Sequence, residues 1–243
     1  MKHLIYLRFE LLRTIRNRRF LIFSLAFPLV LYVTVAGAHK NVSLDGISFP
    51  LYYLSGMAAW GSMNAVISSG ARIAQERSVG WTRQLRITPL STRDYFVAKI
   101  LSGYLMALFS IVVLAAAGSI IGVRLSAVQW LTMLGLLLVG LVPFAILGIL
   151  LGHLVSVDTL GPVIGGGTSL MALLGGAYGP LATGGAFLAI VKYLPSYWLV
   201  QAGRSALGGG NAWPAQAWIV LTVWSVVAAR LAARVYRRDT ARV

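Results

Sequence analysis

The sequence has no cysteine, and only six of its 243 residues are acidic. Without cysteine the chain can form neither a disulfide nor a thiolate metal site, and it has no cysteine nucleophile. Charged residues of either sign make up 11% of the chain, whereas an ordinary soluble domain has about a quarter. This low charge, together with a hydrophobic content of 58%, argues against a water-soluble protein.

Several enzyme motifs are missing as well. The chain contains no Gly-Lys pair, and therefore no phosphate-binding loop of the G-x-x-x-x-G-K-[ST] type. It has no H-E-x-x-H or G-x-S-x-G motif, and its three histidines are scattered. We therefore expect no catalytic residue, no metal site and no cofactor bound by this chain, which is not an enzyme by itself.

Long uncharged runs are what the sequence has in abundance. They cover residues 20–38, 46–71, 100–123, 125–152, 159–191 and 205–229, and each is long enough to cross a bilayer as a helix. They predict an all-α integral membrane protein with six transmembrane helices in one domain, residues 1–243. The glycines and prolines of the fifth run predict a span to about residue 178 and then a broken, re-entrant segment over 179–204. An ordinary apolar outer loop is the alternative.

The net charge of +15 acquires a meaning once the basic residues are placed between these runs. With both termini inside, 17 of the 21 Lys and Arg residues fall on the inner side, in the segments 1–19, 72–99 and 230–243. The positive-inside rule therefore predicts a multi-pass protein with both termini in the cytoplasm. The positive charge then sets topology and attracts anionic lipids of the bilayer, and we expect no nucleic-acid partner.

Residues 1–19 form a basic, imperfectly amphipathic segment. One helical stripe carries Leu4, Leu7, Leu11 and Ile15, and another carries Tyr6, Glu10, Arg13 and Asn17. We expect an N-terminal elbow helix that lies in the cytoplasmic interface, with its arginines toward lipid headgroups. A disordered basic flank is the alternative.

The acidic residues all fall outside the predicted spans. They are Glu10, Asp45, Glu76, Asp94, Asp158 and Asp239. Because an ionisable residue inside a membrane is costly and usually functional, their positions predict no ionisable residue deep in a span. A carrier driven by protons or sodium is therefore disfavoured.

The loop between the second and third runs, with QERSVGWTRQLRITPL at residues 75–90, is the most informative segment. Trp81 and Leu85 stand among arginines, and aromatic and Arg side chains dominate protein–protein contacts. Gly80 gives flexibility, and Pro89 ends a short amphipathic turn. The loop is therefore a candidate docking site for a cytoplasmic protein. A solvated, positive-inside loop explains the arginines but not Trp81, Leu85 or Pro89.

This loop resembles the cytoplasmic coupling loop of the ABC transporter type-2 permease family, whose pattern is roughly E-R-x-x-G-x-x-x-x-L-x-x-T-P-L followed by an aromatic residue and a lysine. The matching positions are Glu76, Arg77, Gly80, Leu85, Thr88, Pro89, Leu90, Tyr95 and Lys99. Trp81 and Arg83 depart from the commoner Thr and Glu, and look like a variant of bacterial drug-exporter permeases. The resemblance covers nearly the whole chain.

The resemblance implies a permease that pairs with a second permease, either a copy or a related chain, and with two cytoplasmic ABC ATPase subunits that bind ATP and Mg. A coupling helix in the loop would contact the ATPase through Glu76, Arg77, Gly80, Trp81, Arg83, Leu85, Arg86 and Pro89. Asp158 would be a minor second contact or a helix cap. ATP-driven closure would switch the spans between inward- and outward-facing states, in a bacterial plasma membrane.

The resemblance also implies a substrate path between two permease copies. The candidates to line it are Tyr52, Tyr53, Met57, Trp60 and Asn64, whose aromatic, thioether and amide groups suit an amphiphilic cavity. A lipid-facing or interfacial position is the alternative for these side chains. The G-x-x-x-G spacing of Gly161 and Gly165 in the fifth run makes this pair a candidate contact between permease copies.

The leading hypothesis is therefore the permease subunit of an ATP-driven ABC exporter for amphiphilic, drug- or antibiotic-like molecules. Short outer loops leave no room for an extracellular substrate domain, which favours small molecules over a lipid, a polysaccharide or a peptide. An ATP-independent channel or secondary carrier, and a membrane anchor that docks a cytoplasmic protein, are alternatives from another class.

Overall fold

The computed structural model describes residues 2–16, 22–44, 46–81, 84, 87, 91–179, 186–205 and 213–241. The helices are α1 (Lys2–Ile15), the π-helical turn η1 (Ile22–Ala26), α3 (Phe27–Ala38), α4 (Phe49–Ala71), α5 (Ile73–Ser78), α7 (Thr92–Ile121), α8 (Ala127–Gly140), α9 (Val142–Leu154), α10 (Val157–Leu174), α11 (Ala186–Val191), α12 (Pro195–Ser205) and α13 (Ala215–Ala241). A two-residue antiparallel hairpin, β1 (Ser43–Leu44) with β2 (Ile47–Ser48), is the only sheet in these residues. The prediction of an all-α protein is confirmed.

Four helical stretches of the described chain are long and apolar enough to cross a membrane. They are Thr92–Ile121, Ala127–Leu154, Val157–Leu174 and Ala215–Arg238. The second combines α8 and α9, and a fifth, shorter apolar helix covers Ser24–Ala38. These helices confirm a membrane protein, and the predicted count of six spans depends on how α3 and α4 are assigned.

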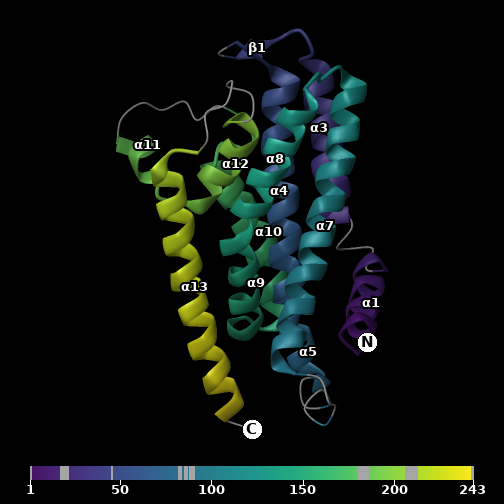
Figure 1. Cartoon of the computed structure of the whole chain (residues 1–243), viewed down its shortest axis with the longest axis vertical. Helices are drawn as coiled ribbons and strands as arrows, with labels where there is room; N and C mark the ends of the chain where they lie inside the picture. Colours follow the sequence, from purple (N-terminus) through teal and green to yellow (C-terminus); the bar gives the residue numbers. More distant parts are fainter. Residues whose placement is uncertain are drawn as a thin grey trace.

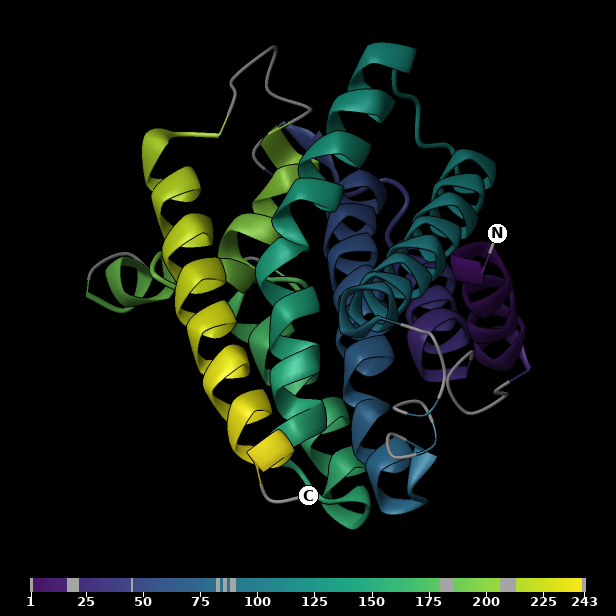
Figure 2. The ribbon, with the colours of Figure 1, turned by 60° about the horizontal axis from the view of Figure 1, so that its bottom comes forward.

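α4 lies at the centre of the bundle. It packs against α3, α7, α9, α10 and α12, and 20 of its 23 residues are buried. Figure 1 shows it running lengthwise among the other helices, and Figure 2 shows α1 and α13 at opposite edges of the molecule. The side chains of α4 therefore face other helices of the same chain rather than lipid.

Glycines allow α9 to approach α4 closely. A Cβ atom on Gly148 would lie 2.5 Å from the carbonyl oxygen of Ile67, and one on Gly152 would lie 2.7 Å from that of Gly70. Such distances are shorter than van der Waals contact, so neither position can carry a side chain without moving a backbone. This G-x-x-x-G pair thus serves packing within the chain.

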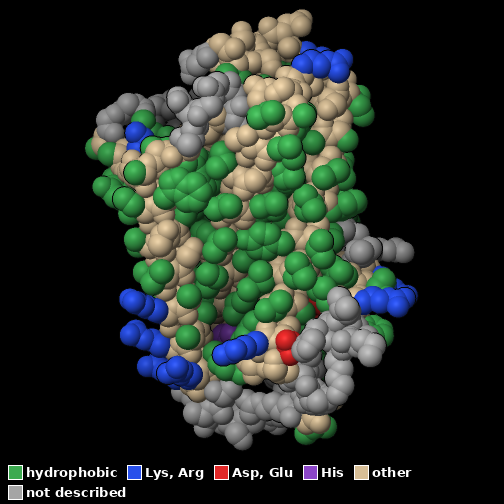
Figure 3. All heavy atoms as spheres, viewed as in Figure 1, with side chains coloured by type: hydrophobic (Ala, Val, Ile, Leu, Met, Phe, Trp, Pro, Cys, Tyr) green, Lys and Arg blue, Asp and Glu red, His purple; other side chains and the backbone are tan. Residues whose placement is uncertain are grey.

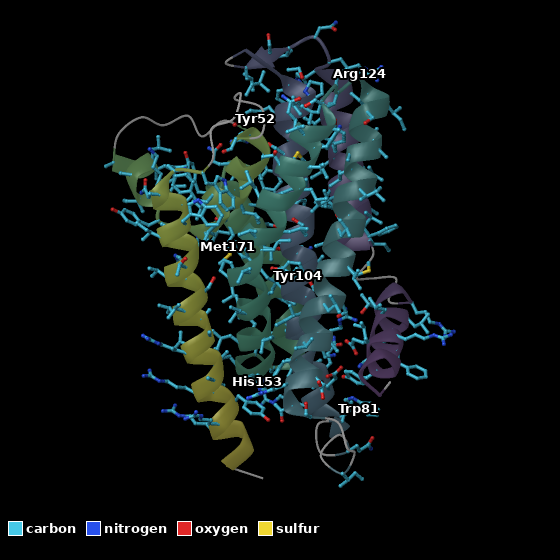
Figure 4. The ribbon with its side chains drawn as sticks, viewed as in Figure 1. Tyr52, Trp81, Tyr104, Arg124, His153 and Met171 are labelled. Atoms are coloured by element: carbon cyan, nitrogen blue, oxygen red, sulfur yellow. The ribbon has the colours of Figure 1, made fainter. Side chains whose placement is uncertain are left out.

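The two ends of the bundle differ in composition. α1, α5 and the C-terminal end of α13 lie toward one end, and the hairpin, α12 and Arg124 lie toward the other (Figures 1 and 4). Figure 3 shows hydrophobic side chains over the middle of the visible face, and Lys and Arg gathered near its ends. This distribution is typical of a helical bundle that spans a bilayer.

The segment before the last long helix is broken into short helices. α10 ends at Leu174, earlier than residue 178, and Gly176 follows in the left-handed region with φ 77°. α12 packs against α4, α8 and α10, and its buried residues include Trp198 and Leu199. α12, which follows the break after α10, is thus covered by protein, as backbone near such a break at membrane depth has to be.

Candidate functional site

A buried ionic cluster joins α1, α5 and α7 at the end of the bundle where α5 lies. Lys99 Nζ lies 2.5 Å from Glu76 Oε1 and 2.6 Å from Glu10 Oε1. Both Lys99 and Glu76 are 0% exposed. Because an unpaired charge in such a place costs several kcal/mol, the three groups hold one another in position.

Glu76 is satisfied on both carboxylate oxygens. Tyr95 donates its hydroxyl to Oε2 at 2.5 Å, and Arg13 donates from Nη1 to Oε1 at 2.6 Å. Arg13 is about half exposed, so the cluster reaches solvent at this arginine. Charge-assisted hydrogen bonds of this length are among the stronger ones in proteins.

The backbone around the cluster brings the side chains of Glu76, Tyr95 and Lys99 close together. Arg72 joins α4 to α5 with helical backbone angles (φ −57°, ψ −17°), so Glu76 follows α4 by little more than one turn. Ser91 caps α7 by accepting from the backbone N–H of Asp94, and α7 then carries Tyr95 and Lys99 one turn apart. Arg72 itself is buried, and its charge lies near those of Glu10 and Glu76.

The carboxylates of the cluster also act on a tyrosine of α1, outside the long helices. The pKa of the Tyr6 hydroxyl in α1 is raised, chiefly by burial and further by the carboxylates of Glu10 and Glu76. The Tyr6 ring lies against that of Tyr95, with centroids 6.3 Å apart. Tyr6 therefore stays a neutral packing group beside the cluster.

α1 packs on α7 through the stripe that carries Glu10. Glu10 and Thr14 are buried, whereas Phe9 and Leu12 are exposed. The reason is Lys99: its buried ammonium needs a carboxylate, and the polar stripe of α1 supplies Glu10.

The last residues of the predicted loop, residues 72–99, are helical in the structure. α7 begins at Thr92 and belongs to a candidate span, so Lys99 is an ionisable residue within a membrane-length helix. The helix tolerates it because Glu10 and Glu76 neutralise it.

Arg77 connects α5 to the end of α9. Its Nη1 donates to the carbonyl oxygen of His153 at 2.6 Å and to that of Gly152 at 3.3 Å. These carbonyls belong to the last turn of α9, where a cation is favoured by the helix dipole. The rings of Phe96, His153 and Tyr236 then join α7, α9 and α13, with centroids 5.4 to 6.2 Å apart.

The segment that follows α5 presents apolar side chains to solvent. Val79, Trp81 and Ile87 are 73%, 39% and 88% exposed. Gly80, which we selected for flexibility, has φ 71°, in the left-handed region that favours glycine. The predicted contacts Arg83, Leu85, Arg86 and Pro89 lie outside the described residues. Asp158, the predicted minor contact with the ATPase, is exposed in the first turn of α10.

The five residues predicted to line a substrate path are all buried within the single chain. They are Tyr52, Tyr53, Met57, Trp60 and Asn64. The single chain thus covers all five side chains, and their role in a path between two permease copies stays a prediction. Trp60 packs edge-on against Phe27 of α3 and against Tyr178, with centroids 5.4 Å apart in both pairs.

Tyr52 has a partner that the sequence did not indicate. The guanidinium carbon of Arg204 in α12 lies 3.7 Å from the centre of the Tyr52 ring, and Nη2 donates to the carbonyl oxygen of Gly176 at 2.8 Å. The structure turns Arg204 inward, where the aromatic face and a carbonyl stabilise its charge.

The candidate dimer contacts Gly161 and Gly165 lie on an open side of α10. Both are exposed, and a Cβ atom on either would meet nothing within 4 Å. This open space contrasts with the crowded Gly148 and Gly152. The two G-x-x-x-G pairs are therefore in different environments, although their sequence spacing is identical.

Comparison with known proteins accounts for this architecture. Residues 3–207 match the family described as ABC-2 type transporter. This chain belongs to the ABC-2 type transporter family. It is also 29% identical over 206 residues to the putative transport permease YvfS of Bacillus subtilis (strain 168), across 83% of this chain and 84% of that protein.

As an ABC-2 transporter subunit, the chain is the multi-pass membrane component of an ABC transporter. Membership of the ABC-2 family implies an ABC ATPase subunit as partner. The recognition made from the 75–90 loop is thereby confirmed at the level of the family. Glu76, Lys99 and Tyr95, which belong to that pattern, are buried in the structure rather than displayed for docking.

Proposed function

We propose that this chain is the permease subunit of an ATP-driven exporter, and that its buried ionic cluster transmits movement of the ATPase to the transport helices. The observation that carries the proposal is the position of Glu76. It lies in the short helix next to the exposed apolar segment, yet its carboxylate is bonded to α1 and α7. A push on that segment would therefore reach both helices.

The ATPase would seat on the segment after α5. Val79, Trp81 and Ile87 form an exposed apolar set there, and such side chains are the usual anchors of an interface. Arg77 holds the base of α5 on the end of α9, so the segment is attached at two places. The predicted contacts Arg83, Leu85, Arg86 and Pro89 fall in the same segment of the sequence.

Movement would pass from α1 to α3. Glu10 of α1 is bound by Lys99, and α1 is followed by η1 and α3, which packs on α4 and α7. α3 covers Trp60 through Phe27, and its Tyr32 stacks with Tyr53 at 6.5 Å between centroids. Displacing α3 would expose the side chains of α4 that we selected as a substrate path. Such coupling requires an element with two alternative positions, and the ATPase has to favour one position over the other.

The topology belongs to the same proposal. We infer six spans, contributed by η1 with α3, by α4, α7, α8 with α9, α10 and α13, in a bacterial plasma membrane. α1 would be the elbow helix, and both termini would be cytoplasmic. Two ATPase subunits and a second permease would complete the transporter, with the open side of α10 at Gly161 and Gly165 as the permease contact.

The proposed cargo is a small amphiphilic molecule of the drug or antibiotic type. Tyr52, Tyr53, Met57, Trp60 and Asn64 offer aromatic, thioether and amide groups but no formal charge, which suits a mostly apolar compound. The described outer connections, such as residues 122–126 between α7 and α8, are short. Export of a lipid, a polysaccharide or a peptide would be the other outcomes of a transport assay.

The test is transport by the reconstituted transporter, with its ATPase, in vesicles that contain a fluorescent amphiphile. We expect Glu76→Gln to lower the amount of compound moved per ATP hydrolysed, because the Lys99 ammonium then keeps only Glu10. The control is Gln75→Ala, which changes the neighbouring exposed side chain of α5. A folded Glu76→Gln variant with wild-type coupling would contradict the proposal.

A further inference from the structure

An apolar crevice opens between α9, α10 and α13, away from the ionic cluster. Its walls include Phe144 and Leu147 of α9, Met171 of α10, and Trp224, Ala228 and Leu231 of α13. The cavity volume within it is about 60 Å³, below the range of about 300–1,000 Å³ that small-ligand sites occupy, so the crevice is an open groove that accepts part of a flexible chain rather than a whole small molecule. Figure 4 shows Met171 between α10 and α13, with His153 lower down beside α13.

The crevice is held open by fixed contacts rather than by a gap between loose helices. α9 and α13 pack along their length. Beyond Leu150 and Leu231, the rings of His153 and Tyr236 lie 5.7 Å apart and join the two helices again. Trp224 donates its indole N–H to the carbonyl oxygen of Tyr193 at 2.9 Å, which fixes the upper end of the wall. A ligand would therefore meet a preformed site.

Cationic side chains stand at the lower end of the same face of α13. One face of α13 carries Trp224, Ala228 and Leu231, which follow one another at helical spacing. The same face continues with Arg234 and Arg238, about one and two turns further along. Both arginines are exposed. Figure 3 shows Lys and Arg side chains in a row along this edge of the molecule, below its hydrophobic surface. Among its described side chains, α13 has no acidic residue.

We propose that the crevice binds an anionic phospholipid of the surrounding leaflet, with an acyl chain between α9, α10 and α13 and the phosphate at Arg234 and Arg238. The apolar walls select a hydrocarbon chain, and guanidinium groups match phosphate oxygens in pairs. An uncharged lipid would use the walls but not the arginines. The inference needs only a membrane location, so it stands or falls separately from ATP-driven transport.

The experiment measures motionally restricted lipid on the full-length protein in vesicles, using spin-labelled phosphatidylglycerol and, separately, spin-labelled phosphatidylcholine. The wild-type protein should hold phosphatidylglycerol more tightly. A basic residue near an anionic surface contributes roughly fivefold in affinity, so Arg234→Gln with Arg238→Gln should remove roughly thirtyfold of that preference. Removing two exposed arginines of α1, by Arg8→Gln with Arg16→Gln, should leave it unchanged.

A second pair of variants tests the acyl-chain part of the site. Ala228→Trp fills the crevice and should lower the amount of restricted lipid of both kinds, whereas Ala229→Trp, on the exposed opposite face of α13, should not. Equal retention of the two lipids by the wild type would overturn the proposal. So would equal effects of the two tryptophans, or a disulfide between two copies through Leu231→Cys, because a protein neighbour would then fill the crevice. Circular dichroism establishes that each variant is folded.

Discussion

The ammonium of Lys99 and the carboxylate of Glu76 lie 2.5 Å apart with neither side chain exposed, although 23 residues separate them in the sequence. Glu10, a further 66 residues back from Glu76, completes the pairing of the same ammonium at 2.6 Å. The packing of α1, α5 and α7 on one another thus depends on the ammonium of Lys99. Since removing one partner of a buried pair leaves a charge without compensation, this cluster should be the most sensitive polar site in the described chain.

Loss of the Glu76 carboxylate should therefore destabilise the protein. For Glu76→Ala we expect a loss of about 3–5 kcal/mol in the free energy of unfolding, as is usual when a buried pair is broken. Thermal unfolding in detergent, followed by circular dichroism, measures it. Asp94→Asn, which changes a carboxylate that is not part of the cluster, should cost far less. Equal losses in the two variants would mean that the Lys99 pair contributes nothing particular.

The glycines of α9 should be intolerant of even one carbon atom. Gly148→Ala places a Cβ atom 2.5 Å from the Ile67 carbonyl oxygen, so α9 must move away from α4. Overpacking of this kind costs about 1–3 kcal/mol, and we expect a lower unfolding temperature. Gly135→Ala in α8 meets nothing within 4 Å and should be neutral or slightly stabilising. A Gly148→Ala variant as stable as the wild type would contradict the close packing.

Trp81→Ala should weaken ATPase binding without unfolding the permease. The side chain is 39% exposed, so its removal leaves no large cavity, whereas an aromatic anchor in an interface is worth about 2 kcal/mol or more, a change of roughly thirtyfold in affinity. Co-purification of the ATPase at graded concentrations measures the change. Gln84→Ala, at an exposed polar position of the same segment, serves as the control. Unchanged ATPase binding by the Trp81→Ala variant would show that Trp81 has no role in docking.

The open side of α10 can be tested with single cysteines, because the chain has none of its own. If two permease copies meet there, Gly161→Cys and Gly165→Cys should form disulfide-linked dimers under mild oxidation in native membranes. Leu170→Cys, an exposed residue on another face of α10, should remain monomeric. Dimers are measured by non-reducing electrophoresis. A stronger cross-link at Leu170 would assign the contact to a different face.

Much of the fold follows from hydropathy. Apolar runs without charge place α7, α8 with α9, α10 and α13, because a membrane-spanning helix has to be apolar along its length. The breaks around Gly175 and Gly176 follow from residue type too, since a turn with φ 77° needs glycine. Boundaries were less predictable: the predicted loop ends at Lys99, where the uncharged run begins, whereas α7 already begins at Thr92.

The candidate site was only partly predictable. The pattern around Glu76 and Arg77 indicated the family, but not that Glu76 faces inward. Its partners Lys99 and Arg13 come from segments 23 and 63 residues away, and a single sequence contains no signal for such pairing. One clue was available: Lys99 stands just before an uncharged run that starts at Ile100, and a lysine at that position needs either solvent or a carboxylate.

The burial of α4 also bears on how the protein enters its membrane. In the six-span arrangement proposed above, α4 would cross the bilayer, yet its tyrosines, serines and Asn64 make it less apolar than the four helices of membrane length and composition. A segment of this kind gains little free energy if it moves from the translocation machinery into lipid by itself, because lipid offers no partners for its polar groups. Its natural partners are α3 and α7, on which it packs. We therefore expect α4 to be retained during synthesis until α7 has emerged, and to enter the bilayer together with its neighbours.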